Sequence, residues 1–278
     1  MITRSSIAAA TLLFAATCFF PTPSHSQPNP LPTWTLIRSS PPEPIVPGVS
    51  YIKKSIAVQD SEIKTGKTLH LITFNNQTAT LKLIDQGDDP KNPPYKNLAD
   101  AMQQNFCIAG CNAGYFMEDF SPAGLTISGG QSIGSFTTHS LYSGTVVVTS
   151  NGALKLLWNN ETKLTSDITE LVQAGPRLVL EGKPKTAYDW NKHRNRTFIL
   201  TDGGSNWAIG LCTTISLSDL ALVLANPEIV SELKVWRALN LDGGTSSSLY
   251  FSRGAGKRPF EFTGFKSVVR NYLGITQR

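Results

Sequence analysis

A strand-like apolar run that ends in an aspartate and two glycines constrains the fold of this chain more than any other segment. The run at 235–241 has the composition of a buried strand. Asp242, Gly243 and Gly244 follow it, and Thr245 and three serines come next. Glycines let a backbone come close to a ligand, and hydroxyls both donate and accept hydrogen bonds. The segment therefore predicts a polar site for a sugar or a phosphate, or else a tight Asp-Gly turn between two strands.

Most of the remaining chain consists of short apolar or alternating runs between turn residues, which is typical of β-strands. Helices are expected to begin at Asn97 and to cover 218–225, the second with Ser216 or Ser218 as its N-cap. We therefore expect a single α+β domain with a mixed β-sheet core and a few helices. Strands are predicted at 50–58, 69–74, 80–84, 107–111, 145–149, 154–158, 178–180, 197–200, 236–241, 249–251 and 268–275.

The first 26 residues have the pattern of a secretory signal peptide. Arg4 supplies the positive start, and the apolar stretch behind it is too short to span a bilayer. Ser24 and Ser26 are small residues at the spacing that a signal peptidase requires. We expect an exported protein, periplasmic or secreted, without stable membrane insertion. Lipid anchoring through Cys18 is the alternative.

Prolines dominate the segment that follows the leader. Residues 27–47 contain seven prolines and little material for a core. Such a composition predicts an extended, poorly ordered linker. The globular domain is accordingly expected over 48–278.

Charge and cysteine content exclude several classes of function. The net charge of +5 is spread along the chain without a basic cluster, so no nucleic acid is expected as a partner. A mild positive excess favours an anionic substrate. No dinucleotide fingerprint, phosphate-binding loop or metal-ligand spacing occurs, so no cofactor or metal is expected. A cation held by Asp and backbone oxygens, which leaves no such spacing, is the alternative. Cys107, Cys111 and Cys212 are expected as buried thiols, with a bridge from either of the first two to Cys212 as the alternative.

Polar and aromatic residues beside predicted strands are candidates for a binding pocket. Asn112, Gly114 and Tyr115 follow a buried strand, where a ring can pack against a sugar face. Arg177 and Arg196 lie at strand starts, and arginine is well shaped to bind phosphate through paired hydrogen bonds. The alternatives are an ordinary loop for the first group and solvated surface side chains for the arginines.

Asp119, Asp202 and His139 are weaker candidates for a second acid or base. Asp119 lies in a loop, where most carboxylates are solvated, and Asp202 precedes two glycines that commonly form a turn. His139 and His193 lie in loops from which they could reach a site, whereas His70 lies in a strand pattern and is expected to be structural.

Several short motifs follow one another along the chain, namely Asn112-Ala113-Gly114-Tyr115-Phe116, Pro122-x-Gly124-Leu125, Gly175-Pro176-x-Leu178-Val179, Arg196-Thr197, Ala238-Leu239-Asn240-Leu241-Asp242-Gly243-Gly244 and Val269-x-Asn271-x-Leu273-Gly274-Ile275. Taken in this order, they resemble the motifs of the phosphodiester glycosidase family. The chain departs from the family at Ala113, Leu200 and Thr245, where the family often has glycine. These departures bear on the shape of the pocket and on the substrate.

The resemblance implies hydrolysis of the anomeric C–O bond of a sugar-1-phosphodiester, which releases free sugar and a phosphomonoester. The oxocarbenium-like transition state of such a reaction is stabilised or attacked by a carboxylate, and the departing phosphate is held by cationic and N–H donors. The catalytic candidates are Asp242 as the principal carboxylate, Arg196 on the phosphate with Arg177 as the second choice, and Asp202 and Asp119. The substrate-binding candidates are Asn112, Gly114, Tyr115, Arg177, His139, Gly243, Gly244, Thr245 and Ser246.

A non-catalytic binder of phosphate-containing cell-surface glycopolymers is the alternative function. Hydroxyls, aromatic rings and arginines serve binding as well as they serve catalysis. Release of free sugar from a sugar phosphodiester supports the enzyme, whereas saturable binding without release supports the binder.

Overall fold

The computed structural model describes residues 31–59, 66–254, 256–265 and 268–278. The signal peptide predicted over 1–26, with Cys18, lies outside the described residues. The region from Pro32 onward forms one compact unit. Its described part contains nineteen strands in three sheets and two α-helices.

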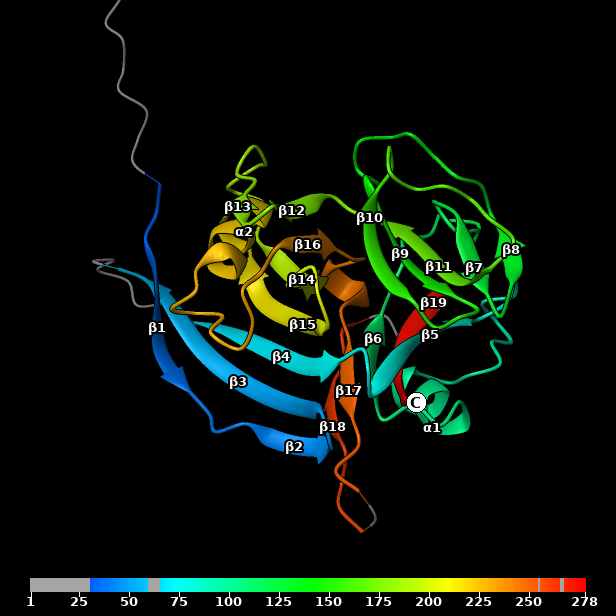
Figure 1. The fold of residues 1–278 in the computed structure, drawn as a ribbon, viewed down its shortest axis with the longest axis horizontal. Coiled ribbons are helices and arrows are strands. Elements are labelled where there is room, and N and C mark those ends of the chain that lie inside the picture. The colour runs from blue at the N-terminus through cyan, green and yellow to red at the C-terminus, as the bar shows by residue number, and fades with distance from the viewer. Residues whose placement is uncertain (1–30, 60–65, 255, 266–267) are drawn as a thin grey trace, which may run out of the picture. The chain divides into compact units, whose positions relative to one another are not determined.

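The largest sheet has nine strands and forms one side of the domain in Figure 1. Its order is β1-β3-β4-β15-β14-β16-β12-β13, and β2 pairs with β3. The strands are β1 (Trp34–Ser39), β2 (Glu43–Val46), β3 (Val49–Val58), β4 (Lys67–Asn75), β12 (Arg177–Leu180), β13 (Lys183–Pro184), β14 (Arg194–Thr201), β15 (Asn206–Ile215) and β16 (Arg237–Asn240).

Two five-stranded sheets complete the domain. One has the order β10-β9-β11-β7-β8, with β7 (Thr126–Ser128), β8 (Gln131–Ile133), β9 (Gly144–Thr149), β10 (Leu154–Trp158) and β11 (Ile168–Ala174). The other has the order β18-β17-β6-β19-β5, with β5 (Ala79–Asp85), β6 (Ala109–Asn112), β17 (Leu249–Phe251), β18 (Phe260–Phe262) and β19 (Asn271–Gln277).

The expected α+β class with a mixed sheet is only partly right. The single domain is confirmed, but the domain is largely β, with α1 (Leu98–Gln104) and α2 (Leu217–Ala225) as its α-helices among the described residues. Every pairing between described strands is antiparallel, so the sheets are not mixed. The physical reason is that short turns join many consecutive strands, and parallel strands would need long crossover connections.

Alternating side chains of β14 join two separate cores, because successive residues of a strand point to opposite faces of its sheet. Ile199 lies in the core between the three sheets. Phe198 and Leu200 lie on the other face, in the core that α2 covers. Ser216 caps α2 by accepting a hydrogen bond from the Asp219 N–H at 3.0 Å. Of the two serines predicted as the N-cap, Ser216 is therefore the one that serves.

The segment predicted as a linker contains ordered structure. β1 and β2 lie within 27–47 and pair with β3, in contrast to the expected extended linker. Trp34 explains the difference, because its ring is buried and its Nε1–H donates to Asp219 Oδ1 at 3.0 Å. A proline-rich segment can thus add edge strands when one aromatic residue anchors it to the core.

The three cysteines of the described region are buried free thiols, as the first interpretation expected. Burial raises the pKa of the Cys107 thiol to about 11. These thiols are therefore protonated at neutral pH.

His70 is expected to make the domain less stable in mild acid. It is buried, and its Nδ1 lies 2.7 Å from the Tyr51 hydroxyl. Burial, reinforced by the charge of Lys53, lowers the pKa of His70 from 6.5 to about 4. Because the unfolded chain takes up this proton at a higher pH than the folded chain, stability is lost as the pH falls from 6.5 toward 4. We expect a loss of about 3 kcal/mol between pH 7 and pH 4.

Urea unfolding at both pH values measures this effect. A His70→Gln variant, which cannot take up the proton, should show a clearly smaller pH dependence than the unmodified protein. Equal pH dependence in the two proteins would contradict the assignment.

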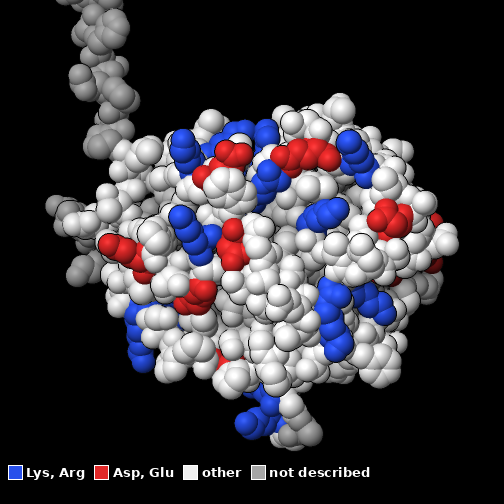
Figure 2. Space-filling view, viewed as in Figure 1, with Lys and Arg blue, Asp and Glu red and all other residues white. Residues whose placement is uncertain are grey.

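Charges of both signs are interspersed over the face shown in Figure 2, without a continuous basic stripe. Within the described region, neither helix has the length and apolar composition that crossing a membrane requires.

Candidate active site

Antiparallel pairing brings three strand ends of the large sheet together. Phe198 of β14 pairs with Asn240 of β16, so the start of β14 lies beside the end of β16. Arg196 of β14 pairs with Cys212 of β15, so the end of β15 lies at the same edge. This register carries Asp242, which follows β16, toward Arg196, although 45 residues separate them in the sequence.

The end of β16 is also joined to the end of β6 in another sheet. The Asp242 N–H donates to the Ala113 carbonyl at 2.8 Å. Asn112 is fully buried, and its Nδ2 donates to the Asp242 carbonyl at 2.7 Å. Its Oδ1 accepts from Thr197 Oγ1 at 2.8 Å and from the Ser248 N–H at 2.9 Å. Asn112 therefore holds the backbone on both sides of the Asp242 turn.

A pocket of about 460 Å³ opens at this junction of strand ends. Its lining combines the acidic side chain of Asp242 with Arg194, Arg196 and His193, and with the backbone of the two glycines that follow Asp242. Such a volume falls within the range of small-molecule sites. The lining residues are Tyr115, His193, Arg194, Asn195, Arg196, Thr214, Asp242, Gly243, Gly244, Thr245 and Phe265.

Arg196 is fixed by hydrogen bonds to main-chain carbonyls. Its Nε donates to Ile215 at 3.2 Å and its Nη2 to Lys192 at 2.7 Å. The residue is only 8% exposed. Burial lowers the pKa of the guanidinium from its ordinary value, with Tyr115 acting in the opposite direction, but an arginine stays charged at neutral pH. The site thus contains a rigid cation.

Tyr115 forms the wall next to Arg196. Its hydroxyl donates to the Gly175 carbonyl at 2.7 Å and accepts from Asn240 Nδ2 at 2.6 Å. Burial raises the pKa of the Tyr115 phenol, the negative charge of Asp242 raises it further, and the charge of Arg196 lowers it. The phenol therefore stays neutral between two charged residues of the same pocket.

The two glycines after Asp242 are required by the backbone. A Cβ on Gly243 would lie 2.9 Å from the Asn195 carbonyl oxygen, and Gly244 has a φ of +65°. The Gly243 N–H donates to Asp242 Oδ1 at 2.8 Å, which orients the carboxylate. Thr245 is exposed on the pocket, whereas Ser246 is buried and is not among the lining residues.

The structure places several predicted residues outside this pocket. Asn112 and Gly114 are buried behind it, and the Gly114 N–H donates to Asn271 Oδ1 at 2.7 Å. Arg177 lines a different pocket, where its guanidinium carbon lies 5.4 Å from the centre of the Trp158 ring. Their positions therefore do not support the prediction that Asn112 lines the pocket, nor Arg177 as the second choice for holding the phosphate.

The weaker acid and base candidates also lie elsewhere. Asp202 forms the turn between β14 and β15, where its Oδ1 accepts from the Gly204 N–H at 2.7 Å. It follows β14 at the end opposite to Arg196, roughly 20 Å away at about 3.3 Å per residue. Asp119 is exposed, and a hydrogen bond from Ser121 lowers the pKa of its carboxyl. His139 is exposed, with its Nδ1 accepting from the Leu141 N–H at 3.2 Å.

Several pocket residues were not among the predicted site residues. His193, considered only as a loop histidine that could reach a site, lines the pocket and lies with Nε2 3.9 Å from Asp219 Oδ2. Arg194 and Asn195 directly precede Arg196 in the sequence, and this neighbourhood is the signal that could have identified them as pocket residues. Thr214 and Phe265 join the site only through the fold.

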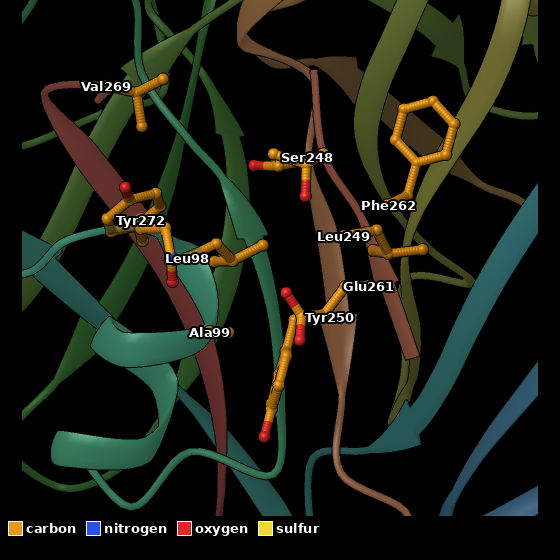
Figure 3. Close-up of a pocket in the computed structure, with 11 residues that line it drawn as sticks. Leu98, Ala99, Ser248, Leu249, Tyr250, Glu261, Phe262, Val269 and Tyr272 are labelled. Carbon is orange, nitrogen blue, oxygen red and sulfur yellow. The ribbon is translucent and has the colours of Figure 1, made fainter. Parts of the chain in front are cut away.

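A smaller cavity, separate from this pocket, is lined in part by residues that follow the Asp242 turn in the sequence. Figure 3 shows Ser248, Leu249 and Tyr250 of the segment after the turn, with Leu98 and Tyr272 on the other side. Its volume of about 20 Å³ accommodates little more than one water molecule. Among the residues that the structure describes, no three His, Cys, Asp or Glu side chains are grouped so that they could hold a metal ion.

The fold is similar to that of solved proteins. One is the catalytic domain of zebrafish N-acetylglucosamine-1-phosphodiester alpha-N-acetylglucosaminidase, auto-inhibited by its pro-peptide, with a TM-score of 0.61, 14% identity, and coverage of 88% of this chain and 89% of that chain. Another is a hypothetical protein from Synechocystis, with a TM-score of 0.52, 15% identity, and coverage of 84% of this chain and 62% of that one.

Sequence comparisons complete the assignment. No curated protein matches the chain. The model of the phosphodiester glycosidase family, however, matches residues 105–276. These residues form more than half of the chain, and they include β6, β14 and β16 with the pocket between their ends. The protein therefore belongs to the phosphodiester glycosidase family.

Proposed function

We propose that this protein hydrolyses the anomeric C–O bond of a sugar-1-phosphodiester and releases a free sugar and a phosphomonoester. The observation that carries the proposal is that Asp242 and Arg196 line one pocket. A carboxylate and a fixed guanidinium in one pocket match the two opposite charges that this reaction develops. Family membership and the fold similarity to a phosphodiester glycosidase support the same class of reaction.

The reaction separates charge between the sugar and the phosphate. As the C–O bond breaks, its electron pair stays on the phosphate oxygen and positive charge develops on the sugar ring. The Asp242 carboxylate stabilises or attacks that positive centre, and Arg196 holds the departing phosphate. The oxygen of water ends on the anomeric carbon, and its released proton goes to the phosphomonoester or to solvent. Because a phosphate is already a good leaving group, the mechanism has little need of a strong general acid.

Hydrolysis in ¹⁸O-labelled water tests the proposal. With the methyl ester of N-acetylglucosamine α-1-phosphate as substrate, the label is expected in the released sugar. Label in the phosphate instead would indicate P–O cleavage and overturn the proposed bond. Saturable binding of the ester without any release of sugar would support the alternative of a non-catalytic binder.

Replacing Arg196 with glutamine is expected to lower kcat by about 10²-fold, because one fixed donor to the developing charge is lost. Sugar release under saturating substrate measures the effect. Arg177→Gln is the matched control, since Arg177 is a partly buried arginine at a strand start that lines a different pocket. An equal loss of kcat in the two variants would contradict the role assigned to Arg196. Thermal unfolding of both variants separates this loss from a loss of fold.

A further inference from the structure

A second pocket shares a wall with the pocket that contains Asp242. It has a volume of about 290 Å³. Tyr115 and Arg196 line both pockets, so these two side chains separate them. Arg196 donates one N–H from Nε and one from Nη2 to main-chain carbonyls, which leaves the two N–H groups of Nη1 and the second of Nη2 for a ligand. A phosphate held by Arg196 would therefore lie at the boundary of the two pockets.

The two pockets differ in chemistry. Most side chains that line the first are polar or charged and lie around the Asp242 turn, with Phe265 as its purely apolar side chain. The second is lined mainly by the apolar side chains Leu141, Pro176 and Leu217 and by the ring of Tyr142. The Tyr142 ring lies edge-on to the Tyr115 ring, with 5.5 Å between their centres, so the aromatic surface continues to the shared wall. Lys192 and Asp189 are the other charged residues of this pocket besides Arg196.

A phosphodiester links two groups through one phosphate, here the sugar and an alcohol component, and each group needs its own binding site. We infer that the second pocket binds the alcohol component of the substrate, and that this component is apolar, namely an aromatic ring or a short hydrocarbon chain. The inference rests on the proposed function, because that function places the phosphate on Arg196. The sugar then lies beside Asp242, and the alcohol component lies across Tyr115 in the apolar pocket. A second sugar would leave its hydroxyls facing Leu141, Pro176 and Leu217 without hydrogen-bond partners.

The volume limits the size of the apolar group. A pocket of about 290 Å³ lies at the lower end of the range for small-molecule sites, so it suits one ring or a short chain. Each methylene placed in a hydrophobic pocket is worth about 10-fold or more in binding. We therefore expect benzyl and hexyl groups to be bound at least about 10-fold more tightly than a methyl group.

Binding of phosphomonoesters tests the inference without knowledge of the sugar, because the monoester product retains the alcohol component. Calorimetry should give a Kd for benzyl phosphate or hexyl phosphate at least about 10-fold lower than that for methyl phosphate or mannose 6-phosphate. Benzyl and hexyl phosphate distinguish an aromatic from a lipid-like alcohol. Leu141→Gln should reduce the ratio between benzyl and methyl phosphate. Leu164→Gln should not, since Leu164 is 55% exposed, like Leu141 at 52%, but lies outside both pockets.

The outcomes separate this inference from the proposed function. Equal affinity for all four monoesters, or a ratio that Leu141→Gln leaves unchanged, would overturn the apolar alcohol component while sugar release from a diester still supports the hydrolase. Tighter binding of mannose 6-phosphate than of benzyl phosphate would assign the pocket to a sugar instead. Absence of binding by every monoester would overturn the inference. Absence of sugar release in the labelled-water experiment, with apolar monoesters still preferred, would overturn the proposed reaction and leave an apolar phosphate-ester site.

Discussion

Asp242→Asn should reduce sugar release by on the order of 10³-fold, which corresponds to about 4 kcal/mol of transition-state stabilisation. Asparagine has the shape of aspartate and can still accept the hydrogen bond that the Gly243 N–H donates to Oδ1 at 2.8 Å. The turn and the fold should therefore be kept while the negative charge is lost. An oxocarbenium-like transition state depends on that charge. The rate of sugar release under saturating substrate measures the effect, and thermal unfolding shows whether the fold is intact.

The sequence contains a matched control for this variant. Asp202-Gly203-Gly204 repeats the tripeptide Asp242-Gly243-Gly244. In the turn between β14 and β15, the Asp202 carboxylate accepts from Gly204 N–H and Asn206 N–H, and it does not line the candidate active site. Asp202→Asn should therefore keep nearly full activity. Full activity of Asp242→Asn, or an equal loss in the two variants, would contradict the assignment of Asp242 as the principal carboxylate.

The strands that carry the site could be predicted from local sequence, because each combines a clear apolar run with a recognisable end. The runs at 197–200 and 236–241 are observed as β14 (Arg194–Thr201) and β16 (Arg237–Asn240). The turn interpretation of Asp202 is also confirmed. Local signals of this kind depend only on neighbouring residues, and they hold here because the turn residues punctuate the strands sharply.

The arrangement of the strands could not be predicted in the same way. β15 (Asn206–Ile215) lies at the centre of the large sheet but was not predicted, because its buried run is interrupted by Gly210 and does not alternate. Because β15 was not predicted, neither its antiparallel hairpin with β14 nor the all-antiparallel pairing of the sheet could be predicted. The same gap left Arg177 as the second choice, after Arg196, for one phosphate site. The sheet register separates them into different pockets.

Asn112 was predicted to line the pocket, but its side chain is buried behind the pocket. A sequence motif identifies a residue near a site, but it does not distinguish a side chain that contacts substrate from one that supports the turn behind it. Asn112 is fully buried and joins Asp242, Thr197 and Ser248 through its amide. It is therefore a positioning residue, and its replacement should affect both stability and turnover.

Asn112→Ala should destabilise the domain by about 4 kcal/mol, since three buried hydrogen bonds are lost at roughly 1–3 kcal/mol for each group left unpaired. Urea unfolding measures this loss. Activity per folded molecule should also fall, because the Asp242 carbonyl loses the amide that holds it at 2.7 Å and the carboxylate is no longer fixed beside Arg196. Since Asn112 does not contact the pocket, the fall should appear mainly in kcat and much less in KM.

Thr197→Val provides the graded comparison that separates support of the fold from support of the turn. It removes only the hydroxyl that donates to Asn112 Oδ1 at 2.8 Å, and valine matches threonine in shape. We expect a loss of about 1 kcal/mol in stability and a kcat close to that of the unmodified protein, because the bond from Asn112 to the Asp242 carbonyl is kept. If Thr197→Val lowers kcat as much as Asn112→Ala does, the loss follows general destabilisation. If Asn112→Ala keeps full kcat at a temperature where it is folded, Asn112 does not position Asp242. A large loss of kcat in Asn112→Ala alone would show that one buried amide holds the reacting carboxylate in place.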